Sequence, residues 1–165
     1  MIFKIFKEKK EAQNEKLEVF ASLTGRVLDI ENVPDEVFSK KMLGDGIAIE
    51  PSEGELTSPF DGKVKQVFST GHALVLESRG IPFLIHVGID TVKLKGEGFR
   101  LYVNEGDAVK KGQLLLTFDK ELIFNKGFSL ITPVIIPDMK RVKGIIKTDK
   151  KNVIKGVDVL LEVIL

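Results

Sequence analysis

The feature that most constrains the fold is the division of the chain into short apolar runs that end at turn-forming residues. Each run is rich in β-branched or other large apolar side chains and is bounded by Gly, Pro, Asp, Asn or Ser, which is typical of β-strands. The runs are residues 62–68, 73–77, 81–85, 114–118, 132–136 and 157–161. Together with 15 glycines, this pattern predicts an all-β fold, a sandwich or barrel of antiparallel strands.

Helical signals are few. Residues 34–39 begin like a single helical turn, and Asp119 is placed to cap a short helix over residues 120–126 that stops at Gly127. We therefore expect one or two short helices.

Weak internal repetition accompanies the strand pattern. Residues 24–27 (TGRV) are echoed by residues 61–64 (DGKV), and residues 109–112 (VKKG) by residues 153–156 (VIKG). Each echo precedes an apolar run. The repeats favour a duplicated motif whose two copies pack face to face as related sheets.

Composition excludes several function classes. The chain has 165 residues, a formal net charge of +1 and no cysteine. The lack of cysteine excludes disulfides, thiolate metal sites and cysteine nucleophiles. The near-zero charge argues against a nucleic-acid partner, and no apolar run approaches the ~18 residues of a membrane-spanning helix.

The first sixteen residues differ from the rest because they mix apolar residues with many charges. We expect residues 1–16 to form a flexible tail or a short basic amphipathic helix, in which residues 1–10 would touch a membrane surface. Residues 17–165 are expected to form one domain.

His72 and His86 are the only histidines, and they fall in neighbouring predicted strands. The intervening Ser78, Arg79 and Gly80 indicate a turn, so an antiparallel hairpin would bring the two imidazoles together. Asp90 follows closely and could bond a nearby group or orient a ring. Three chemistries stay open for such a pair, namely a phosphoryl group carried on one ring, a shared metal, and general acid–base catalysis.

Several longer motifs resemble one known family. They are residues 33–38 (VPDEVF), 44–49 (GDGIAI), 58–62 (SPFDG), 70–73 (TGHA), 84–92 (LIHVGIDTV) and 94–99 (LKGEGF). Over residues 19–165 the chain is similar to the glucose-type enzyme IIA phosphocarriers of the bacterial phosphoenolpyruvate-dependent sugar phosphotransferase system. One departure is Ser22, in a stretch where the family often has Ala-Pro. The resemblance implies a β-sandwich built from a duplicated motif, and it assigns residues 17–165 to an EIIA domain of this type.

The resemblance also implies the roles of four residues. His86 would accept a phosphoryl group through Nε2 from the phosphohistidine of HPr and pass it to a cysteine of the IIB domain of a sugar permease. His72 would brace the phosphoryl oxygens, and the Thr70 hydroxyl would hold the His72 ring. Asp90 would tune partner release by repelling the incoming negative charge.

The same resemblance implies an apolar docking patch and no cofactor beyond the covalent phosphate. The patch residues are Val37, Phe38, Met42, Leu43, Phe68, Leu84 and Val92. No metal site is expected within the chain, although His72 and His86 could share a zinc ion with a partner's carboxylate. The expected location is the cytoplasm, in some members near the inner face of the membrane.

Two alternatives accompany this interpretation. A lipoyl- or biotinyl-type carrier domain is suggested by residues 104–113 and by Met139 and Lys140, but it leaves His72 and His86 unexplained. A regulatory protein would bind transporters or metabolic enzymes in its unphosphorylated state, through the same surface.

Overall fold

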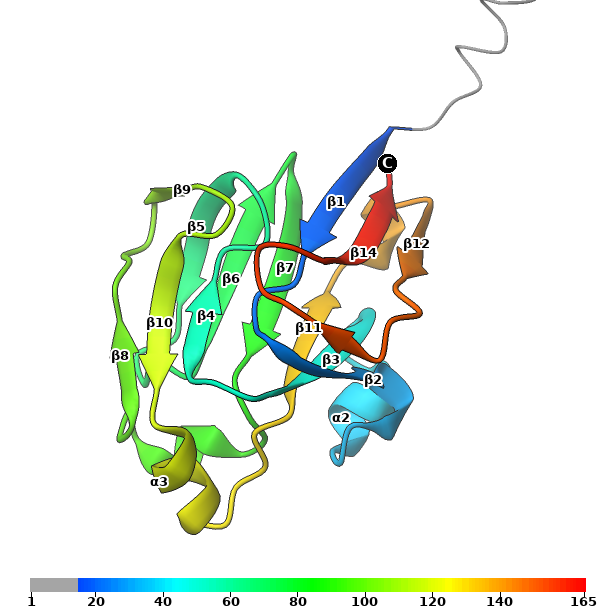
Figure 1. The fold of residues 1–165 in the computed structure, drawn as a ribbon. Coiled ribbons are helices and arrows are strands. Elements are labelled where there is room, and N and C mark those ends of the chain that lie inside the picture. The colour runs from blue at the N-terminus through cyan, green and yellow to red at the C-terminus, as the bar shows by residue number, and fades with distance from the viewer. Residues whose placement is uncertain (1–14) are drawn as a thin grey trace, which may run out of the picture.

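The computed structural model describes residues 15–165 (Figure 1). The strands are β1 (Lys16–Phe20), β2 (Gly25–Asp29), β3 (Asp45–Pro51), β4 (Glu55–Thr57), β5 (Gly62–Val67), β6 (Ala73–Ser78), β7 (Ile81–His86), β8 (Phe99–Leu101), β9 (Ala108–Val109), β10 (Leu114–Phe118), β11 (Thr132–Ile136), β12 (Gly144–Lys147), β13 (Asn152–Val153) and β14 (Val159–Ile164). The described helices are α2 (Glu36–Ser39), α3 (Lys120–Asn125) and the 3-10 turns η1 (Ile30–Asn32), η2 (Thr91–Leu94) and η3 (Met139–Arg141).

The predicted all-β class is confirmed, and both predicted helices form as short pieces. Asp35 Oδ1 accepts from Val37 N at 2.8 Å at the start of α2, and Asp119 Oδ1 accepts from Leu122 N at 3.1 Å at the start of α3. These side chains cap backbone N–H groups that have no partner within the helix. None of the helices among residues 15–165 is long and apolar enough to cross a membrane. The expected membrane contact of residues 1–10 falls outside the described residues.

One predicted strand is displaced along the chain. The run over residues 157–161 was expected to be extended, but β14 begins at Val159. Asp158 closes the preceding turn instead, because its Oδ2 accepts from Ile154 N at 2.7 Å. A side chain that bonds the backbone of a nearby residue in this way competes with the strand ladder.

The strand order reads as two related halves. The largest sheet has the order β13-β2-β3-β11-β7-β6-β5-β9, and the other two have the orders β1-β14-β12 and β4-β10-β8. We call β13-β2-β3-β11 the first half and β7-β6-β5-β9 the second half. They meet where β11 pairs with β7, near the centre of the molecule (Figure 1).

The repeated sequence motifs occupy matching places in these halves. In the first half Gly25 pairs with Val153, and in the second half Gly62 pairs with Val109. The small sheets match as well. The sheet β1-β14-β12 has one strand from before the β2–β3 hairpin and two from after it, and the sheet β4-β10-β8 is related in the same way to the β5–β6 hairpin. The expected duplication is therefore visible in the pairing of the strands.

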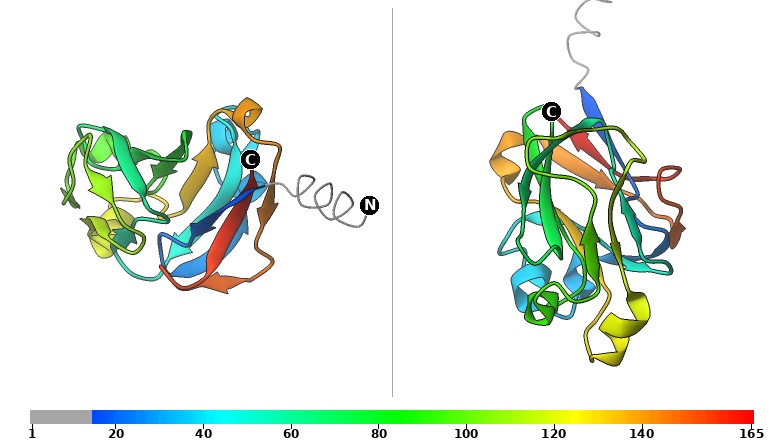
Figure 2. Two further views of the ribbon diagram at one scale, coloured as in Figure 1. Left: turned by 90° about the horizontal axis from the view of Figure 1, so that it is seen from above. Right: turned by 90° about the vertical axis from the view of Figure 1, so that its left-hand side faces the viewer.

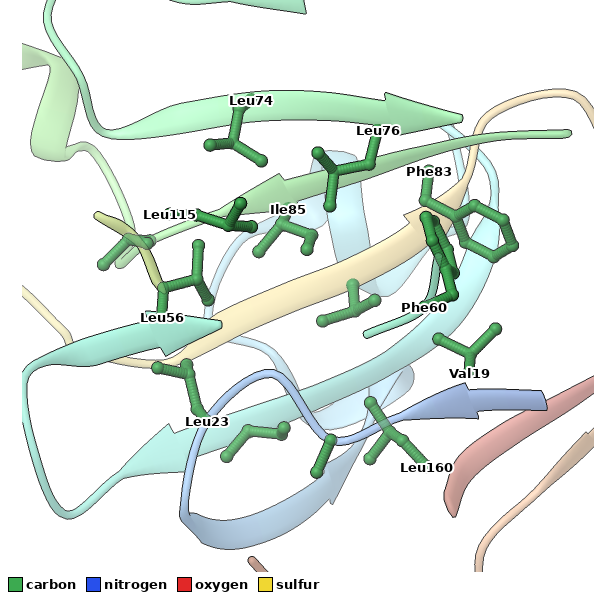
Figure 3. Close-up of a cluster of buried hydrophobic side chains, with 14 of the residues drawn as sticks. Val19, Leu23, Leu56, Phe60, Leu74, Leu76, Phe83, Ile85, Leu115 and Leu160 are labelled. Atoms are coloured by element: carbon green, nitrogen blue, oxygen red, sulfur yellow. The ribbon is translucent and has the colours of Figure 1, made fainter. Parts of the chain in front are cut away.

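One large core joins both halves (Figure 3). It includes Val19 and Leu160 from the sheet of β1, Leu56 and Leu115 from the sheet of β4, and Ile85 from the large sheet, all fully buried. Two further views show the small sheets over opposite ends of the large one (Figure 2). The core fixes β7, and so fixes the strand that ends at His86.

A second, smaller cluster of buried side chains packs beside the end of β7. It contains Phe38 of α2, Ile89, Ile131 and Ile135, together with Ile30, Val33 and Ala48. This cluster supports the loop that follows His86, which is the part of the fold most relevant to function.

Candidate functional site

The β6–β7 hairpin brings the two histidines together. Its turn consists of Arg79 and Gly80, whose φ values of 53° and 79° are both positive, as in the turns that match the twist of an antiparallel pair. His86 pairs with Ala73 in the ladder, and Val87 N donates to His72 O at 2.8 Å. This register places His72 beside His86 at the open end of the hairpin.

The two imidazole rings pack edge to face. Their centroids lie 4.8 Å apart at an interplanar angle of 79°. His72 is almost fully buried, with 3% of its surface exposed, while His86 is half-buried. Phe38 lies 5.4 Å from the His86 ring and Phe68 lies 5.7 Å from the His72 ring, so aromatic side chains flank the pair.

A backbone carbonyl fixes the protonation pattern of His86. His86 Nδ1 lies 2.7 Å from Gly88 O. Because a carbonyl oxygen can only accept, the neutral ring carries its proton on Nδ1 and leaves a lone pair on Nε2. Residue 88 must be glycine, because its φ is +75° and a Cβ there would lie 2.5 Å from Thr91 Cγ2 and 2.7 Å from Ser129 O.

Thr70 holds the other ring. Its Oγ1 lies 2.6 Å from His72 Nδ1. When the hydroxyl donates this bond, Nδ1 is the acceptor and the neutral His72 ring carries its proton on Nε2. The two histidines are thereby suited to complementary tasks, one with a free lone pair and the other with a free N–H.

Burial keeps both rings neutral at pH 7. It lowers the pKa of His72 to about 4, and the nearby His86 ring adds to this effect. Burial also lowers the pKa of His86, against the Gly88 bond and the negative charges of Asp35 and Asp90, which raise it. A neutral imidazole is the nucleophilic form.

The His86 ring is oriented by its hydrogen bond to Gly88 O rather than by Asp90. Asp90 has a φ of 60° and precedes η2, where its side chain makes no capping bond. Its charge raises the pKa of His86, but the hydrogen bond that orients the ring goes to Gly88 O. Asp90 thus influences His86 through its charge, and its part in the site stays a prediction.

The seven residues expected to dock partners differ in exposure. Val37, Met42, Leu43 and Val92 are exposed, with Met42 the most open at 68%, whereas Phe68 and Leu84 are half-buried. Phe38 is 6% exposed, so most of its ring packs within the protein, against His86 and the smaller core. Phe38 thus offers little surface to a partner and chiefly forms a wall of the site.

Sequence reasoning missed three contributions to the site. Asp35 was read only as part of a helix start and a family motif, yet its charge reaches His86. The Gly88 carbonyl and the Thr132 hydroxyl, which accepts from Gly88 N at 3.4 Å, left no side-chain pattern near the histidines. Thr132 is distant in the chain, and only the strand pairing brings it close.

A cavity of about 860 Å³ runs along α3 and residues 127–130, and neither histidine ring lines it. No three His, Asp or Glu side chains of the described chain gather as metal ligands. A partly exposed imidazole flanked by apolar side chains suits a protein partner better than an enclosed small molecule.

Comparison with known proteins agrees with this geometry. Residues 17–142 match the family model for the phosphoenolpyruvate-dependent sugar phosphotransferase system, EIIA 1. A solved structure described as glucose permease IIA from Mycoplasma capricolum is 34% identical, with a TM-score of 0.81, over 90% of this chain and 96% of that one. The chain belongs to the EIIA 1 family of the phosphoenolpyruvate-dependent sugar phosphotransferase system.

Proposed function

We propose that His86 is the residue that carries the phosphoryl group in this protein. Family membership makes the chain a phosphocarrier in sugar uptake, with phosphotransferase activity, and the family works with HPr and the IIB domain of a sugar permease. The observation that supports His86 as the carrier is its bond to Gly88 O, which leaves Nε2 free. The lipoyl- or biotinyl-type alternative is not favoured.

In the proposed reaction the lone pair of His86 Nε2 attacks the phosphorus of the phosphohistidine of HPr. A new N–P bond forms as the old one breaks, and the bonding electrons return to the histidine nitrogen of HPr. The second transfer reverses these roles, because a cysteine thiolate of the IIB domain attacks the phosphorus and His86 returns to its neutral state. Such transfers depend mainly on in-line positioning and electrostatics.

His72 would stabilise the phosphoryl group through its Nε2–H. The Thr70 hydroxyl supports this role because its bond to Nδ1 favours the tautomer with the proton on Nε2. A donor held in place beforehand stabilises developing negative charge without reorganisation during the reaction.

Partners would dock on the apolar surface beside His86. Val37, Met42, Leu43 and Val92 supply exposed apolar area, and Phe68 and Leu84 border it. Such contacts exclude water during transfer while the interface stays short-lived. Asp90 would weaken binding of the phosphorylated state through charge repulsion.

Further roles follow the same proposal. The protein would act in the cytoplasm, need no cofactor other than covalent phosphate, and bind transporters or metabolic enzymes when unphosphorylated. His72 and His86 would hold zinc only with a ligand from a partner. Deleting residues 1–16 and measuring liposome binding tests the membrane contact, which unchanged binding would exclude.

The decisive experiment is phosphorylation with phosphoenolpyruvate, enzyme I and HPr. We expect the intact mass to rise by one acid-labile phosphoryl group, which ³¹P NMR should assign to a histidine Nε2, and tandem mass spectrometry should place it on His86. Loss of this phosphoryl group on addition of a IIB domain would demonstrate the second transfer. A stable adduct, or a phosphoryl group on any other residue, contradicts the assignment.

A further inference from the structure

The Gly88 carbonyl that orients His86 is itself held in place by a distant segment of the chain. The ladder between β7 and β11 ends at the pair Ile85–Val134, so the backbone beyond His86 has left the regular sheet. The N–H groups of Gly88 and Ile89 donate instead to residues 129–132, the stretch that leads into β11.

Residues 129–132 hold the peptide groups on either side of Gly88 through two bonds, and Thr91 Oγ1 also donates to Val87 O at 2.5 Å. Gly88 N donates to Thr132 Oγ1 at 3.4 Å, and Ile89 N donates to Ser129 O at 3.0 Å. The second bond involves the same peptide plane as the Gly88 carbonyl, so it sets the direction in which that carbonyl points. Thr132 Oγ1 in turn donates to Leu130 O at 3.0 Å. This bond makes the hydroxyl an acceptor toward Gly88, and it also holds the backbone stretch that presents Ser129 O to Ile89 N.

We propose that Thr132 is a positioning residue for phosphoryl transfer, acting through Gly88 to hold His86 in the tautomer whose Nε2 is free. The proposal rests on the proposed role of His86. Thr132 is fully buried and touches neither reacting atom, so its effect passes through the backbone. A buried hydroxyl in this place has a specific use, because a valine of the same shape would leave Gly88 N unpaired.

Glycine makes such a support necessary. Gly88 has a φ of +75° and no side chain to restrict it, so an unsupported Gly88 peptide has other accessible orientations. If the carbonyl turned away, His86 Nδ1 would lose its acceptor and the proton would distribute between the two ring nitrogens. Only the fraction with the proton on Nδ1 is ready for attack through Nε2.

The experiment compares three variants with the wild-type protein. Thr132→Val removes the hydroxyl and keeps the shape, and Thr132→Ser restores the hydroxyl. Thr57→Val is the matched control, since Thr57 is also a buried threonine whose Oγ1 donates to a backbone carbonyl, that of Ser22 at 3.4 Å, but it lies on β4 away from the histidines. Folding is checked for each from amide spectra.

Long-range ¹H–¹⁵N correlation spectra at pH 7 report the His86 tautomer. We expect an Nδ1–H ring in the wild type, in Thr132→Ser and in Thr57→Val, and a tautomer mixture in Thr132→Val. The initial rate of phosphoryl uptake from phospho-HPr should fall on the order of tenfold in Thr132→Val, as when a group that orients a functional histidine is lost, and recover in Thr132→Ser.

The tautomer spectrum separates the two proposals. A wild-type tautomer in folded Thr132→Val, or an equal change in Thr57→Val, overturns the role of Thr132 whatever the transfer rate. An altered tautomer with an unchanged uptake rate overturns it as well. If the wild-type protein takes up no phosphate, the proposed function of His86 fails, and with it the reaction that Thr132 would serve, while the spectra still decide whether Thr132 sets the tautomer.

Discussion

The two halves of the large sheet present different residues at equivalent points of their strand pairs β6–β7 and β3–β11. In the second half His86 lies opposite Ala73, and in the first half Ile135 lies opposite Gly46. Ile135 is 1% exposed and closes its half with an aliphatic side chain. The same backbone pairing thus ends in a chemically inert group in one half and in an imidazole in the other.

The neighbouring position shows the same contrast. His72 precedes Ala73 in the second half, and Asp45 precedes Gly46 in the first. Asp45 bonds Lys147 at 2.9 Å. Burial works against its ionisation, but the Lys147 and Gly46 bonds hold its pKa below the usual range. The first half therefore ends in a paired charge and the second in two neutral rings, so the chemistry comes from individual residues placed on a shared scaffold.

The sharpest way to break the contrast is to remove the imidazole of the second half. His86→Ala should abolish phosphoryl uptake, because the other histidine, His72, carries its proton on Nε2 and has its Nδ1 bonded to Thr70. Intact mass after treatment with phosphoenolpyruvate, enzyme I and HPr measures this. The control is Ile135→Val at the equivalent point of the first half, which should cost about 1 kcal/mol of stability and still take up phosphate. Phosphate carried on His72 in His86→Ala would reverse the assigned roles.

A smaller effect is expected at the neighbouring position. His72→Ala should still accept phosphate but transfer it to a IIB domain more slowly, on the order of a hundredfold, the cost typical of losing one preorganised donor. Rapid-quench measurement of each half-reaction separates the two steps. Equal loss in both steps would show that His72 also positions His86.

Acid should lower the stability of the folded protein through protonation of His72, which lies in the second half. Its pKa is lowered from 6.5 to about 4, so between these values the unfolded chain binds the proton more readily than the folded protein. The contribution of His72 to stability should therefore fall as the pH drops from 6.5 to about 4 and change little below that value. Urea midpoints across this range should fall less in His72→Gln than in the wild type. An identical fall in both proteins would show that other groups control the acid response.

The smallest expected effect, on the free energy of unfolding, concerns two equivalent backbone bonds, which we call the crossing points between the halves. Phe20 N donates to Pro59 O, and Thr57 N donates to Ser22 O, both at 2.9 Å, so Ser22 occupies the place that Pro59 has in the other repeat. Ser22 Oγ is buried without a partner among the described residues. Ser22→Pro should raise the free energy of unfolding by roughly 0.4–1 kcal/mol, because proline restricts the unfolded chain.

Urea unfolding measures this gain, and Ser22→Ala serves as the control. Alanine removes the hydroxyl without restricting the backbone, so a gain in both variants would assign the effect to the buried hydroxyl. A loss of stability in Ser22→Pro alone would show that the two crossing points differ in backbone conformation.

The sequence predicted the fold wherever local signals matched the final structure. Residues 114–118 and 132–136 are strands with the expected bounds, β10 and β11, since apolar runs between turn residues leave few alternatives. It was wrong about residues 157–158, where the Asp158 side chain accepts from the backbone N–H of Ile154. The pairing of β11 with β7 joins residues about 50 apart, and nothing local to either strand encodes it.

The candidate site divides in the same way. Short spacing made the proximity of His72 and His86 predictable, because a tight turn joins their strands. Gly88 O and Thr132 act through backbone geometry and across a non-local strand pair, so neither produced a recognisable pattern. The charge of Asp35 reaches His86 from another element, and only the folded chain reveals it.

The hydrogen bond from His86 to Gly88 O has a consequence for how the site tolerates change. A main-chain carbonyl does not titrate, and no substitution at residue 88 removes it directly. The direction in which the carrier nitrogen presents its lone pair is therefore insensitive to acidity and to most mutations, unlike in a site where a carboxylate selects the tautomer. Mutations can alter this direction chiefly at the residues that hold the Gly88 peptide groups, which lie about 45 positions downstream in the chain.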